Sequence, residues 1–229
     1  MQKKEKRLFY EELSWAVGII IVTLGVRLVA HSSFGVSMVV APAYILAQKL
    51  GISFGLGEYL FQGLLLLALI VIYRGVRLGW SFTVVTVLAY GAVLDLWQSL
   101  LDLPPPPGLP GRILCLILGA CLTAFGIALM FRTYLAPQVY ELFVKSVAVK
   151  LKMPPEKFKR IYDISSLCLS AVLALLLFRS IRYDGQWLIG PGTVVCTCVN
   201  SLLITQYGKL LDRLFRFRPA FPGLARYLR

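Results

Sequence analysis

Uncharged apolar runs follow one another along the chain, and most of them are long enough to cross a lipid bilayer. Because an α-helix rises about 1.5 Å per residue, a hydrocarbon core of about 30 Å needs roughly 20 residues. Basic residues and turns separate the runs. The pattern predicts six spans, over residues 15–30, 58–73, 80–101, 112–131, 162–178 and 187–207.

Two further apolar segments, residues 34–50 and 135–151, are shorter, and each carries a polar stripe. The members of each stripe lie three and four positions apart, so a helix would gather them on one narrow face. Short, Pro-containing segments at matching places of two halves are typical of the binding region of a membrane carrier. We therefore expect the stripes to line a pathway, through Ser37, Tyr44, Gln138, Glu141 and Lys145.

The second stripe also contains an acid followed four residues later by a base, Glu141 and Lys145. This order is the preferred one for an ion pair within a helix. Such a pair could open to receive a charged substrate. It could equally serve only to let the helix lie at the membrane surface, and the sequence leaves both interpretations open.

The two halves of the chain share residues at one constant spacing. Gly18 and Gly25 recur about a hundred positions later as Gly119 and Gly126. We interpret the chain as a single membrane domain made from a duplicated block. Repeat 1 covers residues 12–101, a Pro-rich linker residues 102–111, repeat 2 residues 112–212 and a basic cytoplasmic tail residues 213–229.

The topology depends on whether the two short segments cross the membrane. If they do not, each half has three spans, and an odd number makes the halves inverted copies. The positive-inside rule prefers this arrangement, because the basic turn at residues 74–77 is then inside and the Pro-rich linker outside. The sequence thus predicts an all-α polytopic membrane protein with two inverted repeats, each of three spans and one short amphipathic or re-entrant helix. Eight spans with parallel repeats are the alternative.

Composition agrees with a membrane protein. Hydrophobic residues make up 58% of the chain and charged residues 15%, and the mean hydropathy is +0.76, which excludes a soluble domain. A net charge of +13 would suggest a nucleic-acid partner in a soluble protein. Here the basic residues end the apolar runs, where they meet anionic lipid headgroups. We expect a multi-pass protein of the plasma (inner) membrane with both termini cytoplasmic, and no nucleic-acid partner.

Ionisable groups inside spans are costly, and they usually face a partner or a water-filled cavity. Arg27 and Asp95 occupy similar depths, so we hypothesise that they pair, either to order the helices or to meet a substrate. Glu58 and Asp163 lie near span starts, where a carboxylate either caps a helix or faces a polar cavity. Asn200, in mid-span, would bond a neighbouring helix or a ligand.

Catalytic and metal-binding signatures are missing from the sequence. The single histidine, His31, stands apart from any cluster of thiols or carboxylates, and the five cysteines lie within apolar runs. No nucleophile elbow, phosphate loop or paired catalytic carboxylates can be found. We expect no enzymatic activity, no catalytic residues, no metal and no cofactor.

Two striped segments carry a resemblance to a known family. FGVSMVVAPAY at residues 34–44 and TYLAPQVYELFVK at residues 133–145, with the stretches 83–95 and 192–200, resemble the YczE/YyaS/YitT-like family of bacterial integral membrane proteins, in particular a Firmicute branch of it. The likeness covers about residues 12–212. It implies a plasma-membrane protein and carries no agreed substrate.

Two functions from different classes follow. The first is a secondary carrier that moves a small anionic or zwitterionic solute through a polar seam at the repeat interface, with the charge type suggested by Arg27 and Lys145. The alternative is a non-transporting accessory or scaffold protein of a biosynthetic or export system. Membrane lipids, a small-molecule substrate and further copies of the chain are the partners that these functions allow.

Overall fold

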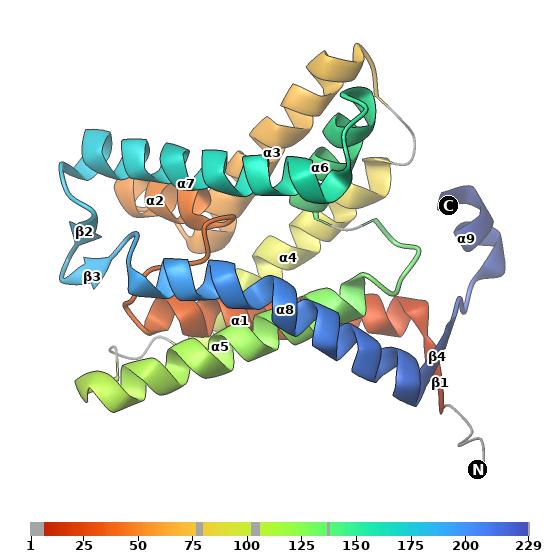
Figure 1. Ribbon diagram of the computed structural model, residues 1–229, viewed down its shortest axis with the longest axis horizontal. Helices are drawn as coiled ribbons and strands as arrows, with labels where there is room; N and C mark the ends of the chain where they lie inside the picture. Colours follow the sequence, from red (N-terminus) through yellow and green to blue (C-terminus); the bar gives the residue numbers. More distant parts are fainter. Residues whose placement is uncertain (1–6, 77–79, 102–105, 137, 229) are drawn as a thin grey trace.

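The computed structural model describes residues 7–76, 80–101, 106–136 and 138–228, so parts of the basic turn at 74–77 and of the Pro-rich linker lie outside the described residues (Figure 1). Its long helices are α1 (Glu11–His31), α3 (Phe54–Tyr73), α4 (Ser81–Leu100), α5 (Gly108–Met130), α7 (Pro155–Phe178) and α8 (Pro191–Leu214). The short helices are α2 (Ala41–Leu50), α6 (Val139–Lys150) and α9 (Pro222–Leu228), and the strands are β1 (Arg7–Tyr10), β2 (Arg182–Tyr183), β3 (Gln186–Trp187) and β4 (Phe215–Arg218).

Six helices of the described chain are long and apolar enough to cross a membrane, and they correspond to the six predicted spans. Helices α2 and α6 have 10 and 12 residues. At about 1.5 Å per residue they reach roughly 15 to 18 Å, well short of a hydrocarbon core of about 30 Å. Both correspond to the striped segments, which therefore form short helices that cannot span by themselves.

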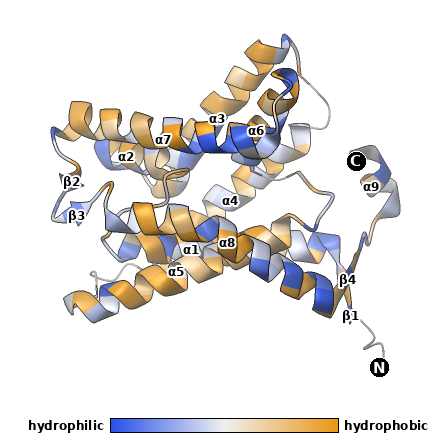
Figure 2. Cartoon of the chain, viewed as in Figure 1, coloured by the Kyte–Doolittle hydropathy of each residue, from blue (hydrophilic) through white to orange (hydrophobic). Residues whose placement is uncertain are grey.

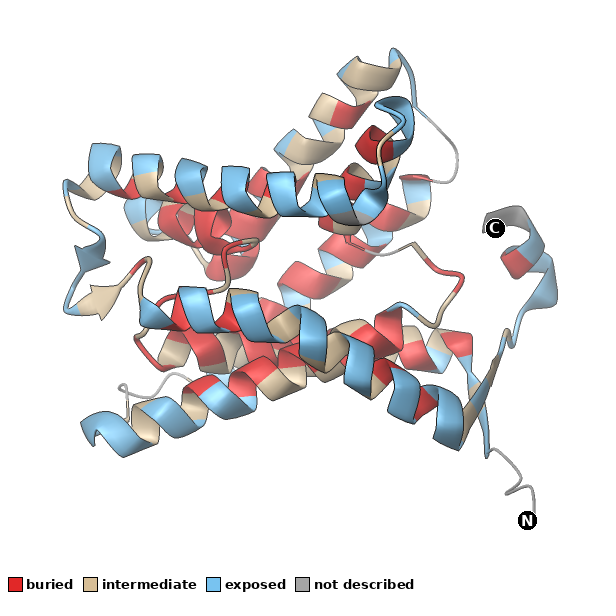
Figure 3. Cartoon of the chain, in the orientation of Figure 1, coloured by how far each residue is buried: buried red, intermediate tan, exposed pale blue. Residues whose placement is uncertain are grey.

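Large apolar side chains cover the outward faces of the long helices. Val71 on α3 is 75% exposed and Leu176 on α7 is 73% exposed. Figure 2 shows hydrophobic residues along most of the length of these helices, and Figure 3 shows that the outer faces of α7 and α8 are largely exposed. A surface of this kind suits contact with lipid rather than with water.

Helices α1 and α5 cross at two pairs of glycines, and the crossing is the closest approach of the two halves. A Cβ atom added to Gly25 would stand 2.7 Å from the carbonyl oxygen of Gly119, and one added to Gly126 would stand 2.8 Å from that of Gly18. As the residue number rises along α1, that of its contact on α5 falls. The two helices therefore run antiparallel, with their backbones in contact.

Helices α1 and α4 instead run in the same direction. The indole of Trp15 donates a hydrogen bond to Thr86 Oγ1 (3.3 Å), and that of Trp97 donates to the carbonyl oxygen of Ile20 (3.1 Å). The residue numbers of the contacting pairs therefore rise together along α1 and α4, as expected for two parallel helices. In the second half, α8 packs beside α5 as α4 packs beside α1. The rings of Phe125 on α5 and Tyr207 on α8 are in contact there.

Each short helix packs against a long helix of the other half, α2 against α7 and α6 against α3. Lys49 at the end of α2 donates to the carbonyl oxygen of Leu177 (3.1 Å), and Lys150 at the end of α6 donates to that of Ile72. Cations favour the carbonyl end of a helix. Each ammonium also lies over a ring of the same helix end, 5.5 Å from Phe178 and 5.2 Å from Tyr73.

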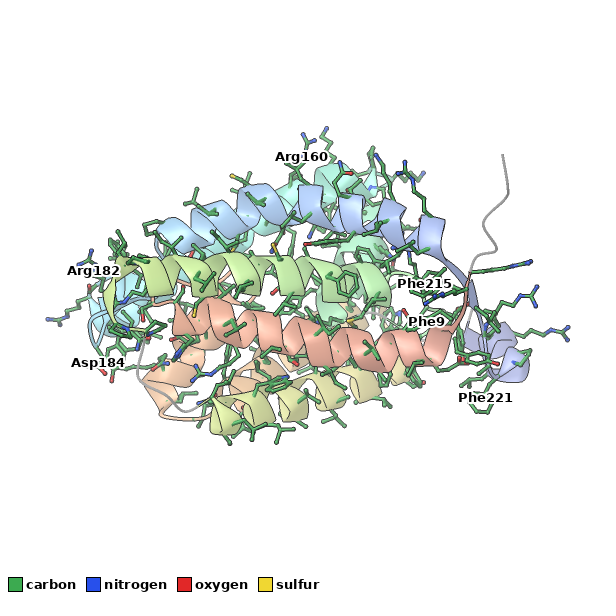
Figure 4. All side chains as sticks on the ribbon, turned by 90° about the horizontal axis from the view of Figure 1, so that it is seen from below. Phe9, Arg160, Arg182, Asp184, Phe215 and Phe221 are labelled. Atoms are coloured by element: carbon green, nitrogen blue, oxygen red, sulfur yellow. The ribbon has the colours of Figure 1, made fainter. Side chains whose placement is uncertain are left out.

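Besides the helices, the described residues contain four short strands. Strand β1, just before α1, pairs in parallel with β4, just after α8, and β2 pairs with β3. Both chain ends therefore lie at one end of the molecule (Figure 1), where Phe9, Phe215 and Phe221 gather, while Arg182 and Asp184 mark the opposite end (Figure 4).

The fifth span begins earlier than predicted. The sequence predicts a span over residues 162–178, whereas α7 already begins at Pro155. Proline is well suited to the first turn of a helix, because its missing N–H would have no partner there and its φ angle is already helical. The helix is consequently about two turns longer than the apolar run.

The glycine crossing yields a stability prediction. Replacing Gly25 by Ala should lower the free energy of unfolding by about 1–3 kcal/mol, because the new methyl group forces α1 and α5 apart. Gly63→Ala on α3 is the matched control, since nothing lies within 4 Å of its added Cβ. Its unfolding midpoint in detergent should be unchanged or higher. Equal midpoints for the two variants would contradict the close crossing.

Candidate functional site: a polar cavity between the halves

A cavity of about 420 Å³ lies at the centre of the helix arrangement. Its walls come from α1, α5, α6, α7 and α8, from Tyr90 of α4, and from residues 37–40 before α2. Its volume falls in the range of small-molecule sites, roughly 300–1,000 Å³. Both halves of the chain therefore contribute to one cavity.

Six of the ten predicted pathway residues line this cavity. They come from four separate parts of the chain: the segment before α2, the beginning and middle of α6, the first half of α7 and the middle of α8. The fold brings them together because α6 is held between α3 and α7. The six are Ser37, Gln138, Glu141, Lys145, Asp163 and Asn200.

Several polar atoms of the cavity wall are buried and make no hydrogen bond with the described part of the chain. Such atoms are expensive unless a polar group or water reaches them. Their concentration around one space indicates that the space takes a polar occupant. The atoms are Thr123 Oγ1, Glu141 Oε2, Tyr162 OH, Asp163 Oδ1, Thr197 Oγ1 and Asn200 Oδ1.

The charges of the cavity are arranged differently from the expected intrahelical pair. Within the described residues, Glu141 has no ion-pair partner, because Lys145 turns its ammonium over the ring of Phe131, 5.7 Å from the centroid. Lys159 lies 3.6 Å from the carboxylate of Asp163. Burial raises the pKa of the Glu141 carboxyl, and the nearby Lys159 opposes that rise. The expected Glu141–Lys145 pair is therefore wrong.

Glu58 lies behind the cavity wall and does not cap a helix. Its side chain is fully buried, and Oε2 accepts hydrogen bonds from Gln62 Nε2 and from Tyr140 OH, both at 2.8 Å. Gln62 in turn accepts from the backbone N–H of Val139 (3.3 Å). Since Tyr140 lines the cavity, this network connects α3 to the cavity through the beginning of α6.

Asp163 is likewise no helix cap, because α7 begins eight residues earlier at Pro155. Its carboxylate lines the cavity instead. The sequence left two interpretations open for Glu58 and Asp163, a helix cap or a place in the polar interior, and the structure favours the polar interior for both residues.

Asp95 fixes the beginning of α3. Its two carboxylate oxygens accept hydrogen bonds from Ser53 Oγ and from the backbone N–H of Gly55, both at 2.7 Å. A helix N-terminus within a membrane needs such acceptors, because lipid offers none. Arg27, the partner proposed from the sequence, donates to the carbonyl oxygen of Leu101 (3.1 Å). Neither Asp95 nor Arg27 lines the cavity.

Tyr44 is the fourth predicted residue outside the cavity. Its ring packs against Phe54, with centroids 5.0 Å apart.

The sequence analysis also missed several residues of the cavity wall. Thr197 could have been found, because it lies three positions before Asn200 on the same face of a helix. The others are Tyr90, Thr123, Tyr140 and Tyr162.

Nothing in the described chain resembles a metal centre. No group of three His, Cys, Asp or Glu side chains within these residues could hold a metal ion.

Comparison with known proteins gives a family but no activity. A family model described as a family of unknown function (DUF6198) matches residues 9–209. The chain is also 25% identical over 207 residues to the uncharacterized protein YyaS of Bacillus subtilis (strain 168), covering 88% of this chain and 94% of that protein. No solved structure matches. The resemblance to YyaS-like proteins is thereby confirmed.

The contacts of Asp95 predict different results for two substitutions. Asp95→Ala removes both acceptors at the beginning of α3 and should lower the free energy of unfolding by about 1–2 kcal/mol. Asp95→Asn keeps an acceptor for the Gly55 N–H and should unfold close to the unsubstituted protein. Thermal unfolding in detergent measures both. An Asn variant as unstable as the Ala variant would show that the negative charge, rather than the cap, is what matters.

Proposed function

The chain belongs to the DUF6198 family, and from its cavity we propose that it is a secondary-transporter-like membrane protein that moves a small polar solute. The observation that supports this function is the group of six buried polar atoms without a hydrogen bond around one space between membrane-spanning helices. A protein that served only as a scaffold would gain nothing from polar groups without partners in its interior.

The proposal includes two inverted repeats that rock against each other. Swapping the repeats exchanges Gly18 with Gly119 and Gly25 with Gly126, and so exchanges the two glycine contacts of α1 with α5. Because α1 and α5 are antiparallel, this relation agrees with six spans and inverted halves, and it argues against eight spans with parallel halves.

The short helices give a second, independent indication of the same symmetry. Lys49 and Lys150 occupy equivalent positions in the two repeats, and each bonds the last turn of a long helix in the opposite half. The cavity lies between these interlocked halves. Rocking of one half against the other would open it alternately to the two sides of the membrane.

A transport measurement tests this function. Proteoliposomes that contain the purified protein should take up at least one solute from a mixture of polar metabolites, read out by mass spectrometry of the vesicle contents. Thr197→Trp fills the cavity and should reduce the uptake at least tenfold, whereas Thr205→Trp, two turns along the same helix and outside the cavity, should retain it.

A folded protein that takes up nothing, and that co-purifies with a protein partner, would contradict transport and support the accessory function. Equal uptake by the Thr197 and Thr205 variants would instead exclude the cavity as the route.

We also propose that the end with both chain termini is cytoplasmic, because it carries the basic residues that follow α6 and α8. In a cysteine-free background, Asp184→Cys in the β2–β3 hairpin should react with an impermeant maleimide from outside the cell. Lys157→Cys at the beginning of α7 should react only after permeabilisation. Labelling of both positions from the same side would contradict six spans.

A further inference from the structure

The hydrogen-bonding character of the cavity wall identifies the kind of group that it can bind. All six wall atoms without a hydrogen bond are oxygens. Those of Glu141, Asp163 and Asn200 accept hydrogen bonds, and the hydroxyls of Thr123, Tyr162 and Thr197 can accept as well as donate. All six atoms can therefore accept a hydrogen bond from a donor on a ligand.

Two of these groups are deeply buried, so water at the protein surface does not supply the hydrogen bonds that they lack. Thr123 is 6% exposed and Tyr162 is 8% exposed, and both line the cavity without a hydrogen bond to the described chain. Together with the carboxylates of Glu141 and Asp163 they favour a ligand group with several N–H donors and a positive charge. A protonated primary amine has three such donors.

Two lysines lie at the same cavity and complement the carboxylates. Lys145 and Lys159 are both exposed: the Lys159 ammonium lies 3.6 Å from Asp163 Oδ1, and the Lys145 ammonium lies over the ring of Phe131. A ligand that carried only a positive charge would be repelled by them, and a purely anionic ligand would be repelled by Glu141 and Asp163. A ligand with one charge of each sign meets favourable charges at both places.

The rest of the lining is apolar. Val22 and Val26 of α1, Ile127 of α5 and Ile204 of α8 border the space. Apolar walls around a few placed polar groups are typical of sites for small organic molecules. An inorganic ion would make no favourable contact with these apolar walls, and an inorganic cation would make none with the two lysines.

We propose that the cavity binds a small zwitterion with an apolar body, whose protonated amine is held by the oxygens of Glu141 and Asp163 and whose acidic group faces Lys145 and Lys159. This assignment rests on the proposed function, since it names the class of solute that is moved. It requires both charges on one molecule.

Matched probes test it through thermal unfolding of the purified protein in detergent, because a ligand that binds only the folded state raises the unfolding midpoint. The zwitterions are leucine and phenylalanine. Isopentylamine and phenethylamine lack the carboxylate, and 4-methylpentanoate and 3-phenylpropanoate lack the ammonium. We expect at least one zwitterion to raise the midpoint, with an affinity at least tenfold above those of its two counterparts.

Variants locate the two charges. Glu141→Gln should weaken binding of the zwitterion and of its amine counterpart about tenfold, and Asp163→Asn should do the same if the Glu141 variant fails to fold. Lys159→Gln should weaken the zwitterion, whereas the amine should bind as tightly as before or more tightly, because a repelling positive charge is removed. Asp212→Asn, which removes a carboxylate paired with Arg132 away from the cavity, is the matched control and should change neither.

A lipid headgroup could present the same two charges. Phosphoethanolamine and nanodiscs with or without phosphatidylethanolamine therefore form a further arm. Stabilisation by that lipid, without a shift from any free zwitterion, would overturn a soluble ligand.

Other outcomes also decide the question. A midpoint shift by the deaminated acids equal to that by the zwitterions would overturn the inference while leaving transport in place. No shift by any probe would overturn it too, and the uptake measurement with the Thr197 variant would then decide transport by itself.

Discussion

The contact of α1 with α5 is the interaction on which the rest of the structure depends. Lipid offers helices no hydrophobic reason to associate, so close backbone packing must hold them together. Gly18, Gly25, Gly119 and Gly126 allow that packing, because any side chain at these positions would meet the opposite backbone. The crossing also sets where the remaining helices stand, since α4 packs beside α1 and α8 beside α5.

The same constraint explains how the helix ends are arranged. A helix that begins or ends inside the membrane leaves backbone groups that lipid cannot satisfy. The beginning of α3 is satisfied by Asp95, and the ends of α3 and α7 by the ammonium groups of Lys150 and Lys49. Charged residues that looked like candidates for a pathway thus partly serve to complete helices. Glu141 and Asp163 at the central cavity keep a carboxylate oxygen that makes no hydrogen bond with the described chain, and so does the buried Glu58 behind its wall.

The six spans could be predicted from the sequence because apolar runs of bilayer length are a direct consequence of the solvent. The recurring glycines could be found as well, although their spacing alone did not reveal which of them touch. Six cavity residues were predicted because the two polar stripes, in residues 34–50 and 135–151, have helical spacing, and because ionisable or amide side chains within spans are rare.

Other features carry no local signal. Tyr140 and Tyr162 are indistinguishable from core aromatic residues in an apolar run, and their roles come from contacts across the bundle. Pairing of β1 with β4 joins segments about two hundred residues apart. The predicted pairing of Glu141 with Lys145 is wrong because the Lys145 ammonium lies over the ring of Phe131, just after α5, and local spacing cannot show such a contact.

Accessibility of the cavity from the two sides of the membrane is the most direct test that both halves move around one polar space. The test uses Ser201→Cys as the single cysteine, because Ser201 lines the cavity. Right-side-out and inside-out vesicles that contain this variant are each treated with an impermeant maleimide. The account predicts reaction from both sides, because the cavity opens alternately to each. A cysteine that reacts from neither side, or from one side only, would contradict it.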